Sequence, residues 1–134
     1  MRKFLIATHG TFSAGAKSSL EMIVGSVENL FIIQAYIDGN HAIEEEIKTI
    51  LNQVNIEDEL IAFTDILGGS VTNQLLQHSI KPNVHIVSGF NLPLLIEVIL
   101  SDAKTPAGEI IEHAIINAKE QMVYVTKLIN SESK

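Results

Sequence analysis

Short apolar runs alternate with amphipathic stretches along most of the chain. The short runs are rich in β-branched and aromatic residues, which favours buried strands, whereas apolar residues recur every three or four positions in the longer stretches, which favours helices. The predicted strands are Lys3–Ala7, Asn29–Ile37, Glu59–Thr64 and Asn83–Val87, with a closing strand at Met122–Leu128. The predicted helices are Ser13–Gly25, His41–Val54, Ser70–Ser79, Leu94–Leu100 and Pro106–Gln121.

This alternation of strand and helix predicts one α/β domain over residues 1–134, with an open, mainly parallel sheet covered by helices on both faces. We expect the strand order 2-1-3-4. Asn130–Lys134 is predicted to be a frayed tail. The apolar run at the N-terminus stops at Thr8, too soon for a secretion signal of ~7–15 apolar residues, and no stretch approaches the ~18 needed to span a bilayer. We therefore expect an unprocessed cytoplasmic protein.

The amino-acid composition excludes several classes of site and of binding partner. The chain has no cysteine, which excludes disulfides, zinc-thiolate centres and cysteine nucleophiles. It has 16 acidic and 9 basic side chains, a net charge of −7 and no basic cluster, so nucleic acid and anionic membranes are not expected partners. The 5 histidines form no pair with metal-ligand spacing, so neither a metal nor another cofactor is expected.

Polar residues gather where the predicted strands end. They follow the first, third and fourth strands, at Thr8–Ser13, Asp65–Ser70 and Ser88–Asn91. Open parallel sheets bind ligands at the carboxyl ends of their strands, where the strand order reverses. With the order 2-1-3-4, the reversal lies between strands one and three, so His9 and Asp65 are predicted to be neighbours.

A histidine paired with a carboxylate suits nucleophilic chemistry. The carboxylate holds one ring nitrogen as N–H, which leaves the lone pair of the other nitrogen directed outward. Glycines at Gly10 and Gly68-Gly69 allow close approach, and helix N–H groups near Ser13 and Ser70 offer a place for an anion. This combination favours phosphoryl transfer to His9. Considered separately, each residue also fits a purely structural role: His9 as an ordinary loop histidine, and Asp65 as the cap of the helix that follows it.

Three longer segments of the sequence also support the hypothesis of phosphoryl transfer to His9. Phe4–Gly10, Phe63–Asn73 and Ser88–Glu97 resemble, in order and spacing, the signature segments of the mannose-type EIIA domains of the bacterial phosphoenolpyruvate:sugar phosphotransferase system. The resemblance implies a phosphocarrier in which His9 accepts a phosphoryl group on Nε2 from phospho-HPr. The group then passes to a histidine of a separate EIIB component, which drives sugar uptake. Asp65 would orient His9 through Nδ1–H.

The same resemblance implies roles for further residues. Gly10, Gly69 and Ser70 would hold the phosphate, whereas Phe12, Leu67 and Asn91 would form the partner-facing rim of the site. The family forms homodimers by exchanging a C-terminal strand, a role that Met122–Leu128 is placed to fill, and it meets the membrane only through the transporter complex. The chain departs from the family at Leu67, where tryptophan is common, and at Val71-Thr72, where Pro-Phe is common. These departures concern partner choice, and nothing in the sequence identifies the sugar.

Three alternatives remain at this point. The phosphotransfer subunit of dihydroxyacetone kinase is similar in fold and in its early histidine, but its loop after strand three does not usually have Gly-Gly-Ser-x-x-Asn. A receiver domain would phosphorylate Asp65, yet Thr8-His9-Gly10 stands where its acidic metal ligands belong. A non-catalytic regulatory docking module of the same fold would need neither His9 nor Asp65.

Overall fold

The centre of the fold is a parallel sheet with its four strands in the order 2-1-3-4, as the sequence predicts. The computed structural model describes residues 1–132. Its strands are β1 (Arg2–His9), β2 (Leu30–Ala35), β3 (Glu59–Thr64) and β4 (Val84–Ser88). Its helices are α1 (Phe12–Val24), α2 (Glu44–Leu51), α3 (Ser70–His78), α4 (Leu92–Ile99), α5 (Ala107–Glu120) and α6 (Val125–Glu132).

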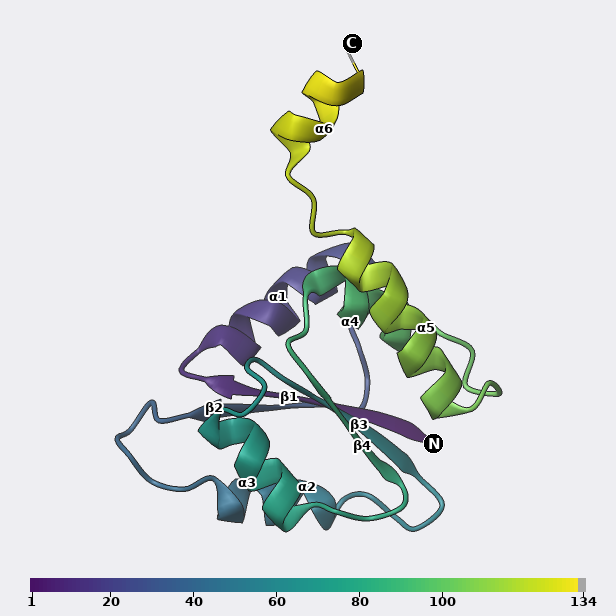
Figure 1. The fold of residues 1–134 in the computed structure, drawn as a ribbon. Helices are drawn as coiled ribbons and strands as arrows, with labels where there is room; N and C mark the ends of the chain where they lie inside the picture. The colour runs from purple at the N-terminus through teal and green to yellow at the C-terminus, as the bar shows by residue number, and fades with distance from the viewer. Residues whose placement is uncertain (133–134) are drawn as a thin grey trace.

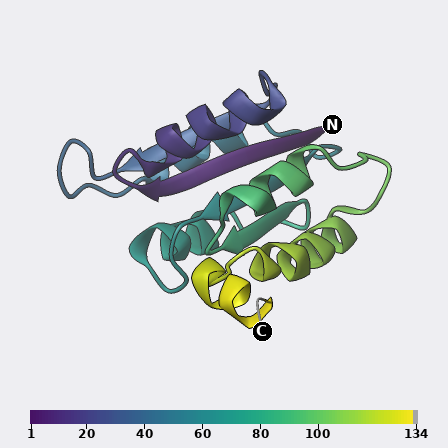
Figure 2. The ribbon, with the colours of Figure 1, turned by 90° about the horizontal axis from the view of Figure 1, so that it is seen from above.

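Helices cover both faces of the sheet (Figure 1). Alternate strand residues point to opposite faces, so Phe4 and Ile6 belong to one apolar core and Leu5 and Ala7 to the other. The first core packs against α1, α4 and α5, which Figure 2 shows side by side, and the second packs against α2 and α3. Burial on both faces explains why the strands consist of nearly continuous apolar runs.

The sheet brings the polar ends of β1 and β3 together. Ala7 of β1 is in register with Thr64 of β3, and His9 is in register with Ala35 of β2. His9 and Asp65 therefore lie at the carboxyl edge of the sheet, at the reversal of strand order. The loops that follow β1, β2 and β3, at residues 10–11, 36–43 and 65–69, contribute to this edge, which we call the carboxyl rim.

The second predicted strand is shorter than expected. Asn29 and Tyr36, the residues on either side of β2, have φ angles of 60° and 66°. This left-handed backbone cannot continue a strand, so β2 is confined to Leu30–Ala35. As a result, Tyr36 leaves the sheet and joins the carboxyl rim.

The prediction of a closing strand at Met122–Leu128 is wrong. Residues 122–124 have no regular structure, and α6 begins at Val125, where the Leu128 N–H donates to the Tyr124 carbonyl at 3.1 Å. A strand needs a neighbouring strand for its hydrogen bonds, whereas a helix forms them internally, and this segment extends away from the sheet (Figure 1). In the predicted frayed tail, residues 130–132 are helical, and residues 133–134 lie outside the described residues.

Asp58 fastens the start of the chain to the turn before β3. Its buried carboxylate accepts a hydrogen bond from the Asn55 N–H at 2.9 Å and forms ion pairs with Lys3 at 3.1 Å and with the Met1 amine at 3.2 Å. The Asn55 hydrogen bond and the two cations outweigh the opposing effect of burial and lower the pKa of Asp58 to about 2.

We expect Asp58→Asn to lower the free energy of unfolding at pH 7. We also expect this free energy to fall less steeply than that of the parent chain as the pH is lowered. The unfolded carboxyl takes up a proton near pH ~4, whereas the folded one stays ionised to about pH 2, so this contribution is present above pH ~4 and is lost as the pH falls toward 2. Urea unfolding at pH 7, 4 and 2.5 measures both effects. Asp102→Asn, at an exposed aspartate, is the control. Parallel pH profiles for Asp58→Asn and the parent chain would contradict the prediction.

Candidate functional site

His9 and Asp65 meet at the carboxyl rim through two hydrogen bonds. The Asp65 Oδ2 atom lies 2.9 Å from the His9 backbone nitrogen and 2.9 Å from the His9 Nδ1 atom. The Asp65 side chain is largely buried, whereas that of His9 is 41% exposed. One carboxylate oxygen thus fixes both the backbone and the ring of His9, while the ring stays accessible.

The ionisation of Asp65 decides the tautomer of His9. Burial alone would raise the pKa of the Asp65 carboxyl, but hydrogen bonds from the His9 backbone and ring outweigh it, so the pKa lies below its ordinary value. An ionised carboxylate only accepts hydrogen bonds, so Nδ1 carries the proton when the ring is neutral. The lone pair is then on Nε2, which faces away from Asp65.

The first turn of α3 lies beside that lone pair. The Ser70 hydroxyl oxygen is 3.4 Å from the His9 Nε2 atom. A methyl group on Gly69 would lie 3.6 Å from the ring carbon Cε1 of His9 and 3.3 Å from the Ile66 carbonyl, so glycine lets the loop approach the ring. Gly68 has a φ angle of +76°, which also favours glycine. The first N–H groups of α3 have no carbonyl partner within the helix, which gives this end a partial positive charge.

Two expected contributors to anion binding have other partners. The Gly10 N–H donates to the Ala35 carbonyl at 2.7 Å, and Gly10 has a φ angle of +57° that turns the chain after β1. The Ser13 N–H donates to the buried Thr8 hydroxyl at 2.7 Å, and the Ser13 hydroxyl donates to the Ile33 carbonyl. Gly10 therefore shapes the loop without turning its N–H toward His9, and the start of α1 is closed internally.

The predicted rim residues lie in different settings. Leu67 is 82% exposed, and Phe12, 55% exposed, stacks on Phe90 with ring centroids 5.3 Å apart. Asn91 caps α4: its side-chain oxygen accepts from the Leu94 N–H at 3.0 Å, and its amide donates to the Ala118 carbonyl at 3.0 Å. Phe12 and Leu67 are thus available for contact, whereas the polar atoms of Asn91 connect α4 to α5.

Tyr36 and Gln74 also belong to the site, although the sequence pattern did not indicate them. The Tyr36 hydroxyl donates to the Ser70 hydroxyl oxygen at 2.8 Å, and the Tyr36 ring centroid is 5.6 Å from that of His9. The Gln74 amide donates to the Tyr36 oxygen at 3.0 Å. The left-handed backbone of Tyr36 costs about 1–3 kcal/mol and is most often retained at functional sites. The available signals were that Tyr36 follows β2 and that Gln74 lies one helical turn after Ser70, but the predicted strand Asn29–Ile37 included Tyr36.

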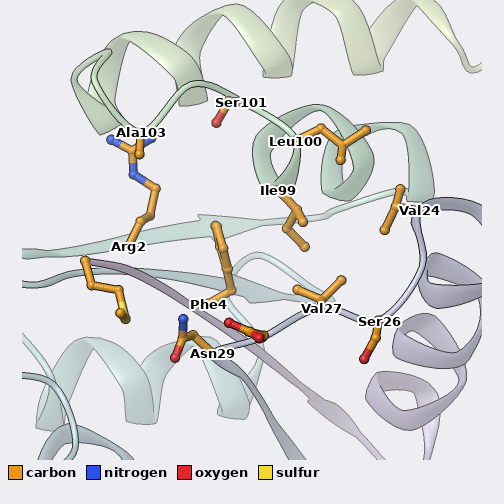
Figure 3. A pocket seen from close by; sticks show the side chains of 12 residues that line it. Arg2, Phe4, Val24, Ser26, Val27, Asn29, Ile99, Leu100, Ser101 and Ala103 are labelled. Carbon is orange, nitrogen blue, oxygen red and sulfur yellow. The ribbon is translucent and has the colours of Figure 1, made fainter.

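A cavity of about 550 Å³ lies at the opposite end of the sheet (Figure 3). Arg2, Phe4, Val27 and Leu100 are among its lining residues. The Arg2 guanidinium donates to the carbonyls of Asp102 and Thr105. Because Arg2 begins β1 and His9 ends it, this cavity is separate from the carboxyl rim.

Two features bear on metals and membranes. Within residues 1–132, the structure brings no three side chains of the His, Asp or Glu type together in a group that could hold a metal ion. None of the helices in that range combines the length and the apolar character that crossing a membrane requires.

The chain is similar in sequence and in fold to known proteins. The family model for the fructose IIA component of the phosphotransferase system, EIIA-man, matches residues 3–115. A candidate phosphoenolpyruvate-dependent sugar phosphotransferase system permease from Klebsiella pneumoniae is 33% identical with a TM-score of 0.88, over 96% of this chain and 93% of that one. The IIA protein associated with the fucose utilization operon of Streptococcus pneumoniae is 32% identical with a TM-score of 0.79, over 96% of each chain.

A more distant structure shares the fold. The mannose/sorbose-specific IIA subunit from Enterococcus faecalis is 21% identical with a TM-score of 0.79, over 91% of this chain and 92% of that one. No curated protein matches the chain. With the family model covering most of its length and the rim bearing an oriented histidine, the chain belongs to the EIIA-man family of phosphotransfer components of the sugar phosphotransferase system.

Proposed function

We propose that His9 is the phosphoryl acceptor of this component, taking the group from phospho-HPr and passing it to a histidine of a separate EIIB protein in the cytoplasm. The observation that carries the proposal is the 2.9 Å contact between His9 Nδ1 and Asp65 Oδ2. It directs the Nε2 lone pair toward Ser70 and the start of α3, where donors for phosphoryl oxygens lie. The pair needs no metal or other cofactor for this step.

The transfer follows from these contacts. The Nε2 lone pair forms the new bond to phosphorus, and the donor atom of phospho-HPr keeps the electron pair of the bond that breaks. The ring retains its Nδ1 proton and gains positive charge, which the adjacent Asp65 carboxylate offsets. The Ser70 hydroxyl and the first N–H groups of α3 stabilise the phosphoryl oxygens. The reverse sequence delivers the group to EIIB.

Exposed apolar side chains around the rim suit docking of protein partners. Ile66 is 55% exposed, and it lies with the still more exposed Leu67 in the loop between Asp65 and Ser70. Phe12 adds a stacked aromatic surface next to the loop that carries His9. Contact with these side chains would bring a partner to His9 while leaving the membrane to other components of the transporter.

The test is a reconstituted relay. Incubation with labelled phosphoenolpyruvate, Enzyme I and HPr should place one phosphate per chain, stable in alkali and lost in acid, because phosphohistidine is labile in acid. Addition of the matching EIIB should then remove the label. An acid-stable phosphate, or no phosphate with active Enzyme I and HPr, would refute the proposal.

We also propose that the protein is a homodimer held by its C-terminal segment, residues 122–129. Met122 is 71% exposed, Tyr124 73% and Ile129 58%, which leaves an apolar segment extending from the single chain (Figure 1). Burial of such side chains contributes roughly 25 cal/mol per Å² of apolar surface. A second copy of the chain, offering the same segment in return, would cover it symmetrically.

Deleting residues 122–134 should convert the dimer to a monomer in sedimentation equilibrium at micromolar concentration. The deletion removes the exposed apolar segment and leaves α5 complete. Deleting only residues 130–134 keeps the apolar side chains in place and is the matched control. A monomeric full-length chain, or a dimer that survives the longer deletion, would contradict the proposal.

A further inference from the structure

Ser70 is the end of a chain of hydrogen bonds that starts in the backbone before α2. The Ile43 N–H donates to the Gln74 side-chain oxygen at 2.8 Å. The Gln74 amide nitrogen lies 3.0 Å from the Tyr36 hydroxyl, which lies 2.8 Å from the Ser70 hydroxyl oxygen. Residues from the β2–α2 connection and from α3 thus converge on the hydroxyl group beside His9.

The direction of every bond in this chain follows from its first member. A backbone N–H can only donate, so the Gln74 oxygen must face Ile43 and its NH₂ group must face Tyr36. The Tyr36 oxygen accepts that bond, so its own hydrogen points to Ser70. The Ser70 oxygen accepts in turn, which leaves the Ser70 hydrogen for His9 Nε2 or for a group bound there.

We propose that Tyr36 and Gln74 are positioning residues that make the Ser70 hydroxyl a hydrogen-bond donor to the phosphoryl group on His9. The inference rests on the proposed function, because it concerns the phosphorylated form of His9. A chain of donors that all point one way strengthens each of its members, and this one ends on an anion. Without it, the Ser70 hydrogen could equally turn to solvent, since Ser70 is exposed.

The geometry of Tyr36 supports a dedicated role. Its backbone keeps a φ angle of 66°, which is unfavourable for an aromatic residue, and this places its ring against His9 and its hydroxyl on Ser70. The Ala35 carbonyl, just before it, is held by the Gly10 N–H at 2.7 Å. The loop after His9 and the strand end before Tyr36 are therefore fixed to each other.

The test starts from protein phosphorylated by phosphoramidate, a small donor that needs no partner protein. Nε2 forms the bond to phosphorus while the phosphorus–nitrogen bond of the reagent breaks and ammonia leaves. The ³¹P NMR signal of phospho-His9 is then followed against pH, and the His9→Ala spectrum identifies signals from other histidines. A hydrogen-bond donor to the phosphoryl oxygens stabilises the deprotonated, more negatively charged form of phospho-His9. It therefore lowers the pH at the midpoint of this titration.

We expect Tyr36→Phe to raise the midpoint of the phospho-His9 titration by about 0.5 pH unit, because the Ser70 hydrogen is no longer directed to the phosphoryl group. Ser18→Ala, which removes an exposed hydroxyl group from α1 and touches no member of this chain of hydrogen bonds, should leave it unchanged. Thermal unfolding shows whether each variant retains the fold. Equal midpoints for the two folded variants would overturn the proposal.

Gln74→Glu supplies a sharper test, because it should reverse the chain. A carboxylate at this position can still accept from the Ile43 N–H, but it also accepts from Tyr36, whose oxygen then accepts the Ser70 hydrogen. The midpoint should rise above that of Tyr36→Phe. Adding Tyr36→Phe to Gln74→Glu frees Ser70 and should lower the midpoint, opposite to its effect in the parent chain. A rise in both backgrounds would overturn the proposal, since the added charge alone predicts no change of sign.

These outcomes are separate from those of the proposed function. A failure of that function appears as no transfer between phospho-HPr and the parent chain. A failure of the hydrogen-bond chain appears in chemically phosphorylated protein, whether or not HPr is a donor.

Discussion

His9→Ala should abolish phosphorylation by phospho-HPr, with a loss of at least about 10³-fold in the rate of labelling. The substitution removes the nucleophilic nitrogen itself, so neither the α3 N-terminus nor Ser70 can compensate. The fold should persist, because the His9 ring is partly exposed and lies at the end of β1. Acid-labile phosphate per chain measures the first effect and thermal unfolding the second.

The matched control is His113→Ala, which removes a different imidazole, 75% exposed, from α5. It should retain full labelling. Persistent acid-labile phosphate in His9→Ala would move the acceptor to another histidine. Loss of labelling in both variants would point to a defect in the assay or in folding.

Asp65→Asn should slow phosphoryl transfer by about 10- to 100-fold and leave its site unchanged. A hydrogen bond to a charged group contributes about 1.5–3 kcal/mol, and here it offsets the positive charge that develops on the His9 ring. An amide oxygen in place of Oδ2 could still accept from the backbone and from Nδ1–H, but without the charge. An amide nitrogen in that place would favour the tautomer that lacks a lone pair on Nε2.

Rapid-quench measurement of labelling from phospho-HPr separates this effect from binding, because the rate at saturating donor reports the transfer step. Asp102→Asn makes the same change in net charge at an exposed loop and should transfer at the parental rate. An Asp65→Asn variant with a parental rate at saturation would show that Asp65 serves only to hold the backbone of His9.

Particular residues show how far the sequence could predict this protein. The apolar runs indicated which residues are buried in β1 and β3, and the expected strand order 2-1-3-4 then placed His9 beside Asp65. Tyr36 could not be selected, because its side chain suits a strand and only its backbone angle separates it from β2. The C-terminal segment was misassigned because apolar residues such as Val123, Tyr124 and Val125 favour a strand, yet a strand requires a neighbour that this part of the single chain does not meet.

The contacts at the rim join parts of the chain that are far apart in sequence. Asp65 lies 56 positions from His9, Ser70 lies 61 positions from it, and Tyr36 reaches Ser70 across 34 positions. Such long-range contacts form only when β1, β2 and β3 have paired. A chain emerging from the ribosome therefore carries His9 early but cannot orient it until Asp65 has been made and β3 has paired with β1. Under the proposed function, a copy whose β1 and β3 have not yet paired lacks the oriented ring that would accept the phosphoryl group.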